Sequence, residues 1–234
     1  NEISTTIAYN AESGNWRWYY DHSTSTPLYP RANEDTTPTD VVDGATIKLR
    51  FGMREIENIT GSDVKMRLQY STFSDFSSDV RFVGELGSST ALWTYGDGVY
   101  DEDDDSIEDV LLSGITLGAT HNESGISTST FDHQAGTIAE WEFTIRDNNA
   151  LVATTYYFRA YDDTNGNAIV KNESFSYPSV VTQAGNLSYS VAGVSTGQTT
   201  EGVTTNITTN ADEIPFGILT NGNDVVGAHR LNIT

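Results

Sequence analysis

The sequence predicts an all-β protein: an Ig-like or jelly-roll-type antiparallel β-sandwich, followed by a second, smaller β module. Apolar and polar residues alternate along most hydrophobic runs, which is the period of a half-buried strand, and helical spacing is almost absent. The pairs Asp43-Gly44, Asn165-Gly166 and Asn221-Gly222 separate such runs and tolerate the positive φ of tight hairpins. Aromatic residues make up 11% of the 234 residues, which is enough for a substantial core.

Six runs in the first part of the chain alternate in this way. We expect strands at residues 3–9, 16–20, 47–53, 64–70, 141–145 and 155–161. The run from Val64 to Tyr70 alternates most cleanly, so we predict that it and the run from Thr155 to Tyr161 are core strands. Further strands are expected at residues 187–191, 214–218 and 225–233.

Aromatic residues divide between the two faces of these strands. Trp16, Trp18 and Trp141 fall on apolar faces, which favours core packing over a sugar-stacking platform. The other faces carry Tyr19, Tyr157 and Tyr161, which are therefore better candidates for contact with a ligand or a subunit.

Basic residues alternate onto the polar faces of the same strands. Arg17, Arg50 and Arg159 point outward in this pattern, as do Lys48 and Lys65. In a strongly acidic chain the simplest interpretation is pairing with carboxylates across strands, giving a structural salt-bridge network. An anion site is the alternative.

A long polar stretch, residues 96–133, interrupts the strand pattern and contains an acidic run. We expect a large surface loop with a short strand or helical turn near residues 107–112. Asp101, Asp103, Asp105 and Asp109 could bind calcium, the one cofactor that the sequence suggests. The EF-hand pattern fails, because Ser106 replaces the turn glycine and Leu112 replaces the last glutamate. A solvated acidic loop is the simpler alternative.

Charge and composition exclude several classes of function. Twelve basic residues against 33 acidic ones give a formal charge of −21, which disfavours nucleic acid and anionic membranes as partners. The absence of cysteine excludes disulfides, and no apolar run is long enough for direct membrane insertion. His22, His121, His133 and His229 share no metal-ligand spacing, and no catalytic motif is present, so no enzymatic activity is expected.

We place a domain boundary so that residues 1–182 form the sandwich and residues 183–234 form the small module. Fifty residues are few for a complete Ig-like module, so the second part is either incomplete or an extension of the first. Six N-glycosylation sequons begin at Asn58, Asn122, Asn172, Asn186, Asn206 and Asn232, and they make a glycoprotein an open alternative.

Several segments together resemble a family of uncharacterised, repeat-rich exported surface proteins of bacteria, of the candidate-phyla type. They are Trp16-Arg17-Trp18-Tyr19-Tyr20-Asp21, Leu49-Arg50-Phe51, Leu68-Gln69-Tyr70-Ser71, Glu140-Trp141-Glu142-Phe143, residues 155–162 and Tyr177-Pro178. The resemblance covers about residues 15–180 and implies a β-sandwich on a cell-surface protein. It also implies that the last residues open a second Ig-like module. It implies no known activity.

These observations favour a secreted structural subunit or stalk module of a pilus-like filament or cell-surface layer. Its partners would be copies of itself or neighbouring surface-protein modules. Residues 1–10 could act as a donor strand, with Ile3, Thr5 and Ile7 pairing beside Leu231 and Ile233 of the next subunit. A glycan-binding or adhesive module is the first alternative, and a hydrolase with a carboxylate pair hidden in the fold is the second.

Overall fold

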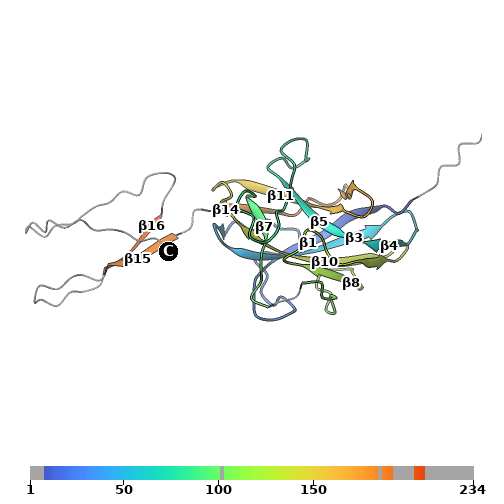
Figure 1. Cartoon of the computed structure of the whole chain (residues 1–234), viewed down its shortest axis with the longest axis horizontal. Helices are drawn as coiled ribbons and strands as arrows, with labels where there is room; N and C mark the ends of the chain where they lie inside the picture. The colour runs from blue at the N-terminus through green and yellow to red at the C-terminus, as the bar shows by residue number, and fades with distance from the viewer. Residues whose placement is uncertain (1–7, 101–102, 184–185, 192–202, 209–234) are drawn as a thin grey trace, which may run out of the picture. The chain divides into compact units, whose positions relative to one another are not determined.

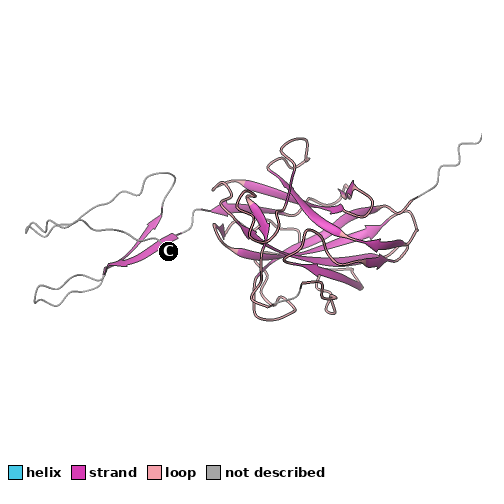
Figure 2. Cartoon of the chain, in the orientation of Figure 1, coloured by secondary structure: helices cyan, strands magenta, loops and turns pink. Residues whose placement is uncertain are grey.

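The computed structural model describes residues 8–100 and 103–183, together with the backbones of 186–191 and 203–208. Every regular element within these residues is a β-strand, which confirms the predicted all-β class (Figure 2). The chain divides into two compact units, Asn1–Ala184 and Gly185–Thr234. No helix in the described part of the chain could span a bilayer.

Unit 1 is a sandwich of two mixed sheets (Figure 1). The first has the order β13-β1-β3-β10-β7 with β8 beside β10, and the second has the order β2-β14-β11-β5-β6 with β12 beside β11. The strands of the first sheet are β1 (Ala11–Tyr20), β3 (Thr46–Glu55), β7 (Trp93–Tyr95), β8 (Leu117–Asn122), β10 (Ile138–Asp147) and β13 (Val170–Lys171). Those of the second are β2 (Val41–Val42), β5 (Met66–Ser71), β6 (Arg81–Phe82), β11 (Thr155–Asp162), β12 (Asn167–Ala168) and β14 (Ser179–Gln183).

Two short strand pairs complete the described structure. In unit 1, β4 (Gly61–Val64) pairs with β9 (Phe131–His133). In unit 2, β15 (Asn186–Val191) pairs antiparallel with β16 (Val203–Thr208), so the strand expected at residues 187–191 is confirmed.

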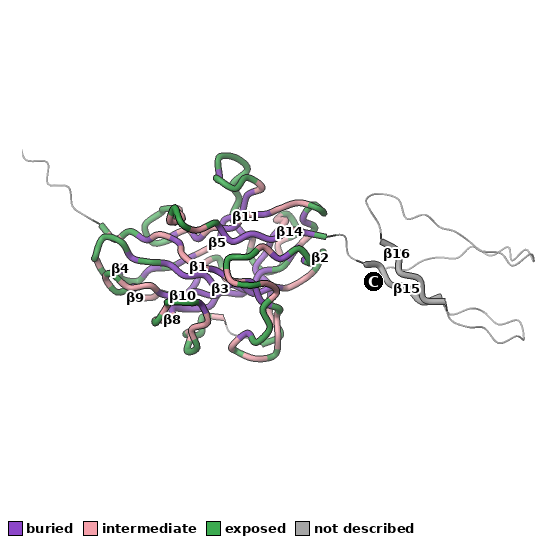
Figure 3. Tube along the Cα trace, turned by 180° about the vertical axis from the view of Figure 1, so that it is seen from behind, coloured by how far each residue is buried: buried purple, intermediate pink, exposed green. Residues whose placement is uncertain are grey.

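The core lies between the two sheets and is built from the apolar faces of their strands. Trp16, Trp18 and Trp141 are fully buried, so the prediction that these tryptophans pack in the core is confirmed, and Trp93 is fully buried as well. Phe158 of β11 joins the sheets, because its ring lies edge-on to Trp18 at 5.3 Å and to Trp93 at 5.2 Å. Buried segments accordingly follow the sheets in Figure 3.

The turn chemistry follows the sequence at two of the three predicted positions. Gly44 and Gly166 both have positive φ, at 76° and 75°. The third pair, Asn221-Gly222, lies outside the described residues.

Two expectations about strand boundaries were wrong. The run from Val64 to Tyr70 is divided at Lys65 into β4 and β5, although its four alternating apolar residues are all buried. The stretch 96–133 contains β8 and β9, while residues 107–112 form neither a strand nor a helical turn. Alternation alone did not identify β8, because Gly118 and Thr120 give it little apolar character.

The end of β1 also differs from the expected pattern. Tyr19, predicted to point outward, is 3% exposed, whereas Tyr20, which alternation groups with Trp16 and Trp18, is 40% exposed. The segment after β1 folds back along the strand, where Pro30 forms a bridge with Tyr19 and Arg31 donates its backbone N–H to the Trp18 carbonyl. This cover buries Tyr19, which is therefore no candidate for ligand contact.

The described chain enters and leaves unit 1 at opposite ends (Figure 3). Tyr9 packs against His133 of β9, and its hydroxyl lies 2.9 Å from the His133 Nδ1. At the other end Gln183 of β14 pairs with Val42 of β2. The residues named for strand donation, Ile3, Thr5, Ile7, Leu231 and Ile233, lie outside the described residues.

Candidate functional site: a polar pocket over a buried ion network

The unusual feature of unit 1 is a set of ionisable residues buried on the first sheet, on the face turned away from the core. Lys48 and Arg50 of β3 and Glu140 and Glu142 of β10 alternate with core residues, so they occupy that face. All four side chains are at most 3% exposed. The placement of Lys48 and Arg50 on the polar face was predicted correctly, but their burial was not.

Register brings these charges together. Arg50 lies directly across from Glu142 in the antiparallel β3–β10 pair, and its Nε donates to the Glu142 carboxylate. The Arg50 Nη1 lies 2.9 Å from Glu140 Oε1, and the Lys48 Nζ lies 3.7 Å from Glu142 Oε1. For Arg50 the predicted cross-strand pairing with carboxylates is confirmed.

His121 joins the network from β8, which runs parallel to β10. Its Nδ1 lies 2.8 Å from Glu142 Oε1, and its Nε2 lies 2.9 Å from the Thr144 hydroxyl. A third partner, Glu123, has its Oε2 3.8 Å from Nε2. Sequence reasoning missed this role because His121 has no metal-ligand spacing and its strand was not predicted.

The network keeps its central carboxylate ionised. Burial alone would raise the pKa of Glu142, but Arg50, His121 and Lys48 outweigh it and lower that pKa to about 2. The same ion pairs raise the pKa of Arg50 against the opposing effect of burial. Glu142 is therefore a poor general acid at neutral pH, because it holds no proton to donate.

The described residues between β7 and β8, 96–100 and 103–116, cover this face and are fastened to it by carboxylates. Glu140 accepts the backbone N–H groups of Leu111 and Leu112, the latter at 2.8 Å. Arg50 donates to the Asp109 carbonyl at 3.1 Å. These bonds satisfy backbone groups at residues 109, 111 and 112 that have no strand partner.

Further carboxylates fasten the edges of the same segment. Asp21 accepts the Val99 N–H at 3.0 Å, and Glu34 accepts the Ser113 N–H at 3.1 Å. The backbone N–H groups of Glu123 and Ser124 donate hydrogen bonds to the Asp103 carboxylate. Burial raises the pKa of Asp103, but the Ser124 hydroxyl and these two N–H donors lower it by more. The net effect is a pKa below the ordinary value.

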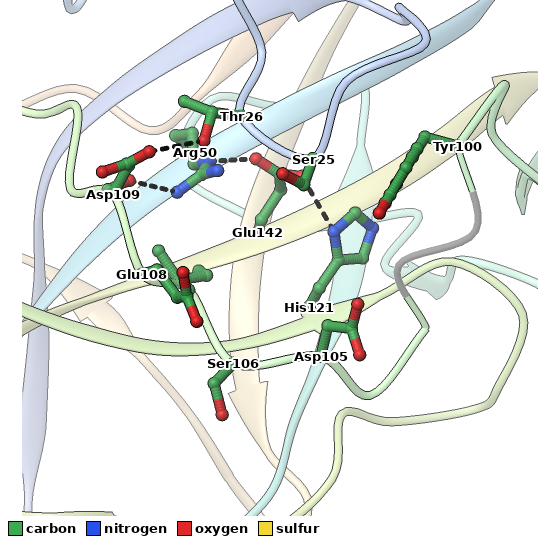
Figure 4. A pocket seen from close by; sticks show the side chains of 11 residues that line it. Ser25, Thr26, Arg50, Tyr100, Asp105, Ser106, Glu108, Asp109, His121 and Glu142 are labelled. Carbon is green, nitrogen blue, oxygen red and sulfur yellow. Dashed lines mark hydrogen bonds and ion pairs between the residues drawn. The ribbon is translucent and has the colours of Figure 1, made fainter.

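A pocket of about 330 Å³ opens between this segment and the first part of the loop after β1 (Figure 4). Arg50, His121 and Glu142 line it from the network, and Figure 4 shows Glu142 joined to both of the others. The remaining lining residues are Ser25, Thr26, Tyr100, Asp105, Ser106, Ile107, Glu108 and Asp109. Tyr100 is 43% exposed.

The structure describes three of the four residues named for calcium, and two of those three line the same pocket. Asp103 is committed to the two N–H groups described above, while Asp105 and Asp109 line the pocket. Asp101 lies outside the described residues. No three histidine or acidic side chains in the described ranges are grouped so as to hold a metal ion. Calcium binding stays a prediction.

The other two arginines of the predicted salt-bridge network bond to uncharged oxygens. Arg17 donates to the Ala32 carbonyl at 2.9 Å, and Arg159 donates to Gln69 Oε1 at 2.8 Å. Arg159 also lies 4.4 Å over the Phe76 ring. For these two residues the expected pairing with carboxylates is replaced by polar and stacking contacts.

The sequons occupy different environments. Asn58 is exposed in a turn and Asn172 is half-buried, whereas Asn122 lies fully buried in β8. Asn122 therefore cannot carry a glycan in the folded state. Asn186 and Asn206 lie on β15 and β16, and Asn232 lies outside the described residues. Tyr157 and Tyr161 are half-buried on the outer face of the second sheet.

The fold and the site define a class: a β-sandwich module with a polar pocket outside its core. No protein-family model matches the chain, and a search of curated proteins found no match.

Proposed function

We propose that the chain is a structural subunit or stalk module of an extracellular filament or cell-surface layer. The observation that carries this proposal is the path of the chain through unit 1, which enters beside β9 and leaves beside β2. Domain termini often lie close together, whereas opposite ends suit modules joined in series.

The strands at the two ends are suited to transmit tension. β1 lies between β13 and β3, and β14 lies between β2 and β11, so each has a hydrogen-bonded neighbour on both sides. Tension along β1 and β14 would pull each strand lengthwise past its hydrogen-bonded neighbours. In this shear geometry many interstrand hydrogen bonds must break at the same time. The sheets also share one continuous core.

The proposed partners are further copies of the chain or neighbouring surface modules. Strand donation by residues 1–10 into the small module of the next subunit would build an open, head-to-tail filament. The formal charge of −21 would keep such a surface protein soluble and away from nucleic acid.

Single-molecule pulling tests the structural role, and the absence of cysteine makes introduced attachment points unique. Handles at Asn10→Cys and Gln183→Cys pull along the path of the chain. Handles at Asn10→Cys and Ser62→Cys are both at one end of unit 1, because the neighbouring residues Tyr9 and Gly61 lie against each other. Force applied between them does not cross the domain. We expect a clearly higher unfolding force for the first pair. Equal or lower force would contradict the proposal.

Electron microscopy tests the filament itself. The purified full chain should form filaments, and deletion of residues 1–9 should leave a folded monomer. Filaments that persist after this deletion would exclude strand donation.

A second function, glycan binding, is favoured by one observation. Tyr100 is exposed and lines the same pocket as the carboxylates of Asp105, Glu108 and Asp109. An aromatic ring beside hydrogen-bonding carboxylates is a suitable surface for a sugar. Binding to a glycan array that is lost in Tyr100→Ala would support this function, and unchanged binding by that variant would exclude the pocket.

A further inference from the structure

The pocket carries a surplus of negative charge. Four of its lining residues have carboxylates (Asp105, Glu108, Asp109 and Glu142) against one guanidinium, that of Arg50, which leaves a formal surplus of three negative charges with His121 neutral. The guanidinium is also shared, because Arg50 is bonded to both Glu140 and Glu142. The charge that an incoming ligand meets at the opening is therefore negative.

The carboxylates nearest the solvent belong to the covering segment. Asp105, Glu108 and Asp109 are exposed, and Asp109 also accepts a hydrogen bond from the Thr26 hydroxyl at 2.8 Å. Backbone hydrogen bonds hold the segment that carries them: the Asp105 carbonyl accepts the His121 N–H, the Asp109 carbonyl accepts from Arg50, and the Leu112 N–H donates to Glu140. These carboxylates form an acidic opening above the buried ion pairs of Arg50, Glu142 and His121.

Size and chemistry favour an organic cation over a metal ion. A volume of about 330 Å³ is at the lower end of the range for small-molecule sites. The exposed ring of Tyr100 can attract a cation or stack against a sugar ring, and Ser25, Thr26 and Ser106 supply hydroxyl groups. The described residues also lack a three-ligand grouping for a metal.

We infer that this pocket selects a small molecule with a primary ammonium group, of the size of an amino sugar. The inference rests on the proposed glycan-binding function and is independent of the structural one. The ammonium group pairs with the carboxylates of Asp105 and Glu108, while Tyr100 contacts the sugar ring. An acetylated or hydroxyl-bearing analogue loses the ion pairs and keeps the remaining contacts.

Titration of the full chain with three matched monosaccharides tests the selectivity. Glucosamine, N-acetylglucosamine and glucose share the ring and differ in the substituent at C2, which carries a positive charge only in glucosamine. We expect glucosamine to bind at least about tenfold more tightly than the two neutral sugars, a difference of about 1.4 kcal/mol. The preference should shrink as sodium chloride is added, because exposed charges are screened.

Two double variants separate a local effect from net charge. Asp105→Asn with Glu108→Gln should remove the preference for glucosamine. Glu57→Gln with Glu173→Gln removes the same charge from exposed positions that do not line the pocket, and it should leave the preference intact. Circular dichroism confirms that each variant is folded.

The outcomes are distinguishable. Equal affinity for all three sugars would overturn the ammonium selectivity and leave glycan binding standing. Loss of the preference in both double variants would overturn it in favour of a general charge effect. Failure of every sugar to bind, including oligomers of glucosamine, would overturn both the inference and the glycan-binding function.

Discussion

Glu142 illustrates how a sequence pattern can predict the face of a sheet on which a residue lies and still miss that the residue is buried. Alternation assigns it correctly to the face opposite Trp141 and Phe143. What alternation does not reveal is that this face is covered, because the cover comes from residues far away in the sequence. The pattern fixes the side of a sheet on which a residue lies, and burial depends on the remaining chain.

Replacement of Arg50 tests the energetic role of the network. In Arg50→Met, Glu140 and Glu142 lose the guanidinium that both share in a fully buried setting. We expect the free energy of unfolding to fall by about 3–5 kcal/mol, because uncompensated buried charge is costly. Urea denaturation measures the change.

Arg81→Met is the matched control. Arg81 pairs with Asp79, but both side chains are largely exposed, so its loss should leave the free energy of unfolding nearly unchanged. If the two variants lost similar free energy, the network would have no special role in stability.

Asp147 gives a pH dependence of known sign. Burial, with a smaller contribution from Asp43, raises the pKa of Asp147 from 3.8 to about 7, although the Ala150 N–H opposes the shift. Between these values the native state holds a proton that the unfolded state has lost. Stability attributable to this group should therefore fall as pH rises from about 4 to about 7, by about 1.4 kcal/mol per pH unit at most.

The variant Asp147→Asn should remove this component, so its melting temperature should fall less than that of the wild type between pH 4 and pH 7. Asp132→Asn, at an exposed position, is the control. Parallel pH profiles for the wild type and Asp147→Asn would contradict the assignment.

At the scale of elements, long regular strands were predictable and the covering segment was not. β3, β10 and β11 carry repeated apolar alternation that defines strands on its own. By contrast, β8 is recognisable only through its partners: β10 on one side and residues 104–107 on the other. The sequence therefore indicated only an acidic loop. The pocket beneath this loop is formed by residues from β3, β8, β10 and the loop after β1, and contacts between segments so far apart cannot be predicted from local sequence.

Gly118 tests how tightly the covering segment lies on β8. A Cβ at this position would stand 1.9 Å from the Ile107 carbonyl oxygen, so Gly118→Ala requires the backbone of the segment to move. We expect a lower melting temperature and faster proteolysis within residues 104–113. Gly14→Ala is the control, since the nearest atom to its Cβ would lie 3.8 Å away. Unchanged proteolysis in Gly118→Ala would show that the segment is loosely held.

At the scale of the whole molecule, charge opposes compaction. The formal charge of −21 predicts self-repulsion that salt screens. We expect the melting temperature to rise as sodium chloride increases from about 10 mM to about 150 mM, over which the screening length shortens to about 8 Å. Glucose at equal osmolarity should have less effect. A melting temperature that falls with salt would mean that exposed ion pairs dominate over repulsion.

The fastening of residues 96–100 and 103–116 by carboxylates has a consequence for the conditions under which the protein can fold. Surface β-sandwiches that brace long loops with disulfides need an oxidant, and thiol reagents release their loops. Here the carboxylates of Asp21, Glu140 and Asp103 accept hydrogen bonds from backbone N–H groups instead. The fold should be indifferent to dithiothreitol and able to mature without an oxidative step, while strong acid, which protonates the carboxylates, should release the segment.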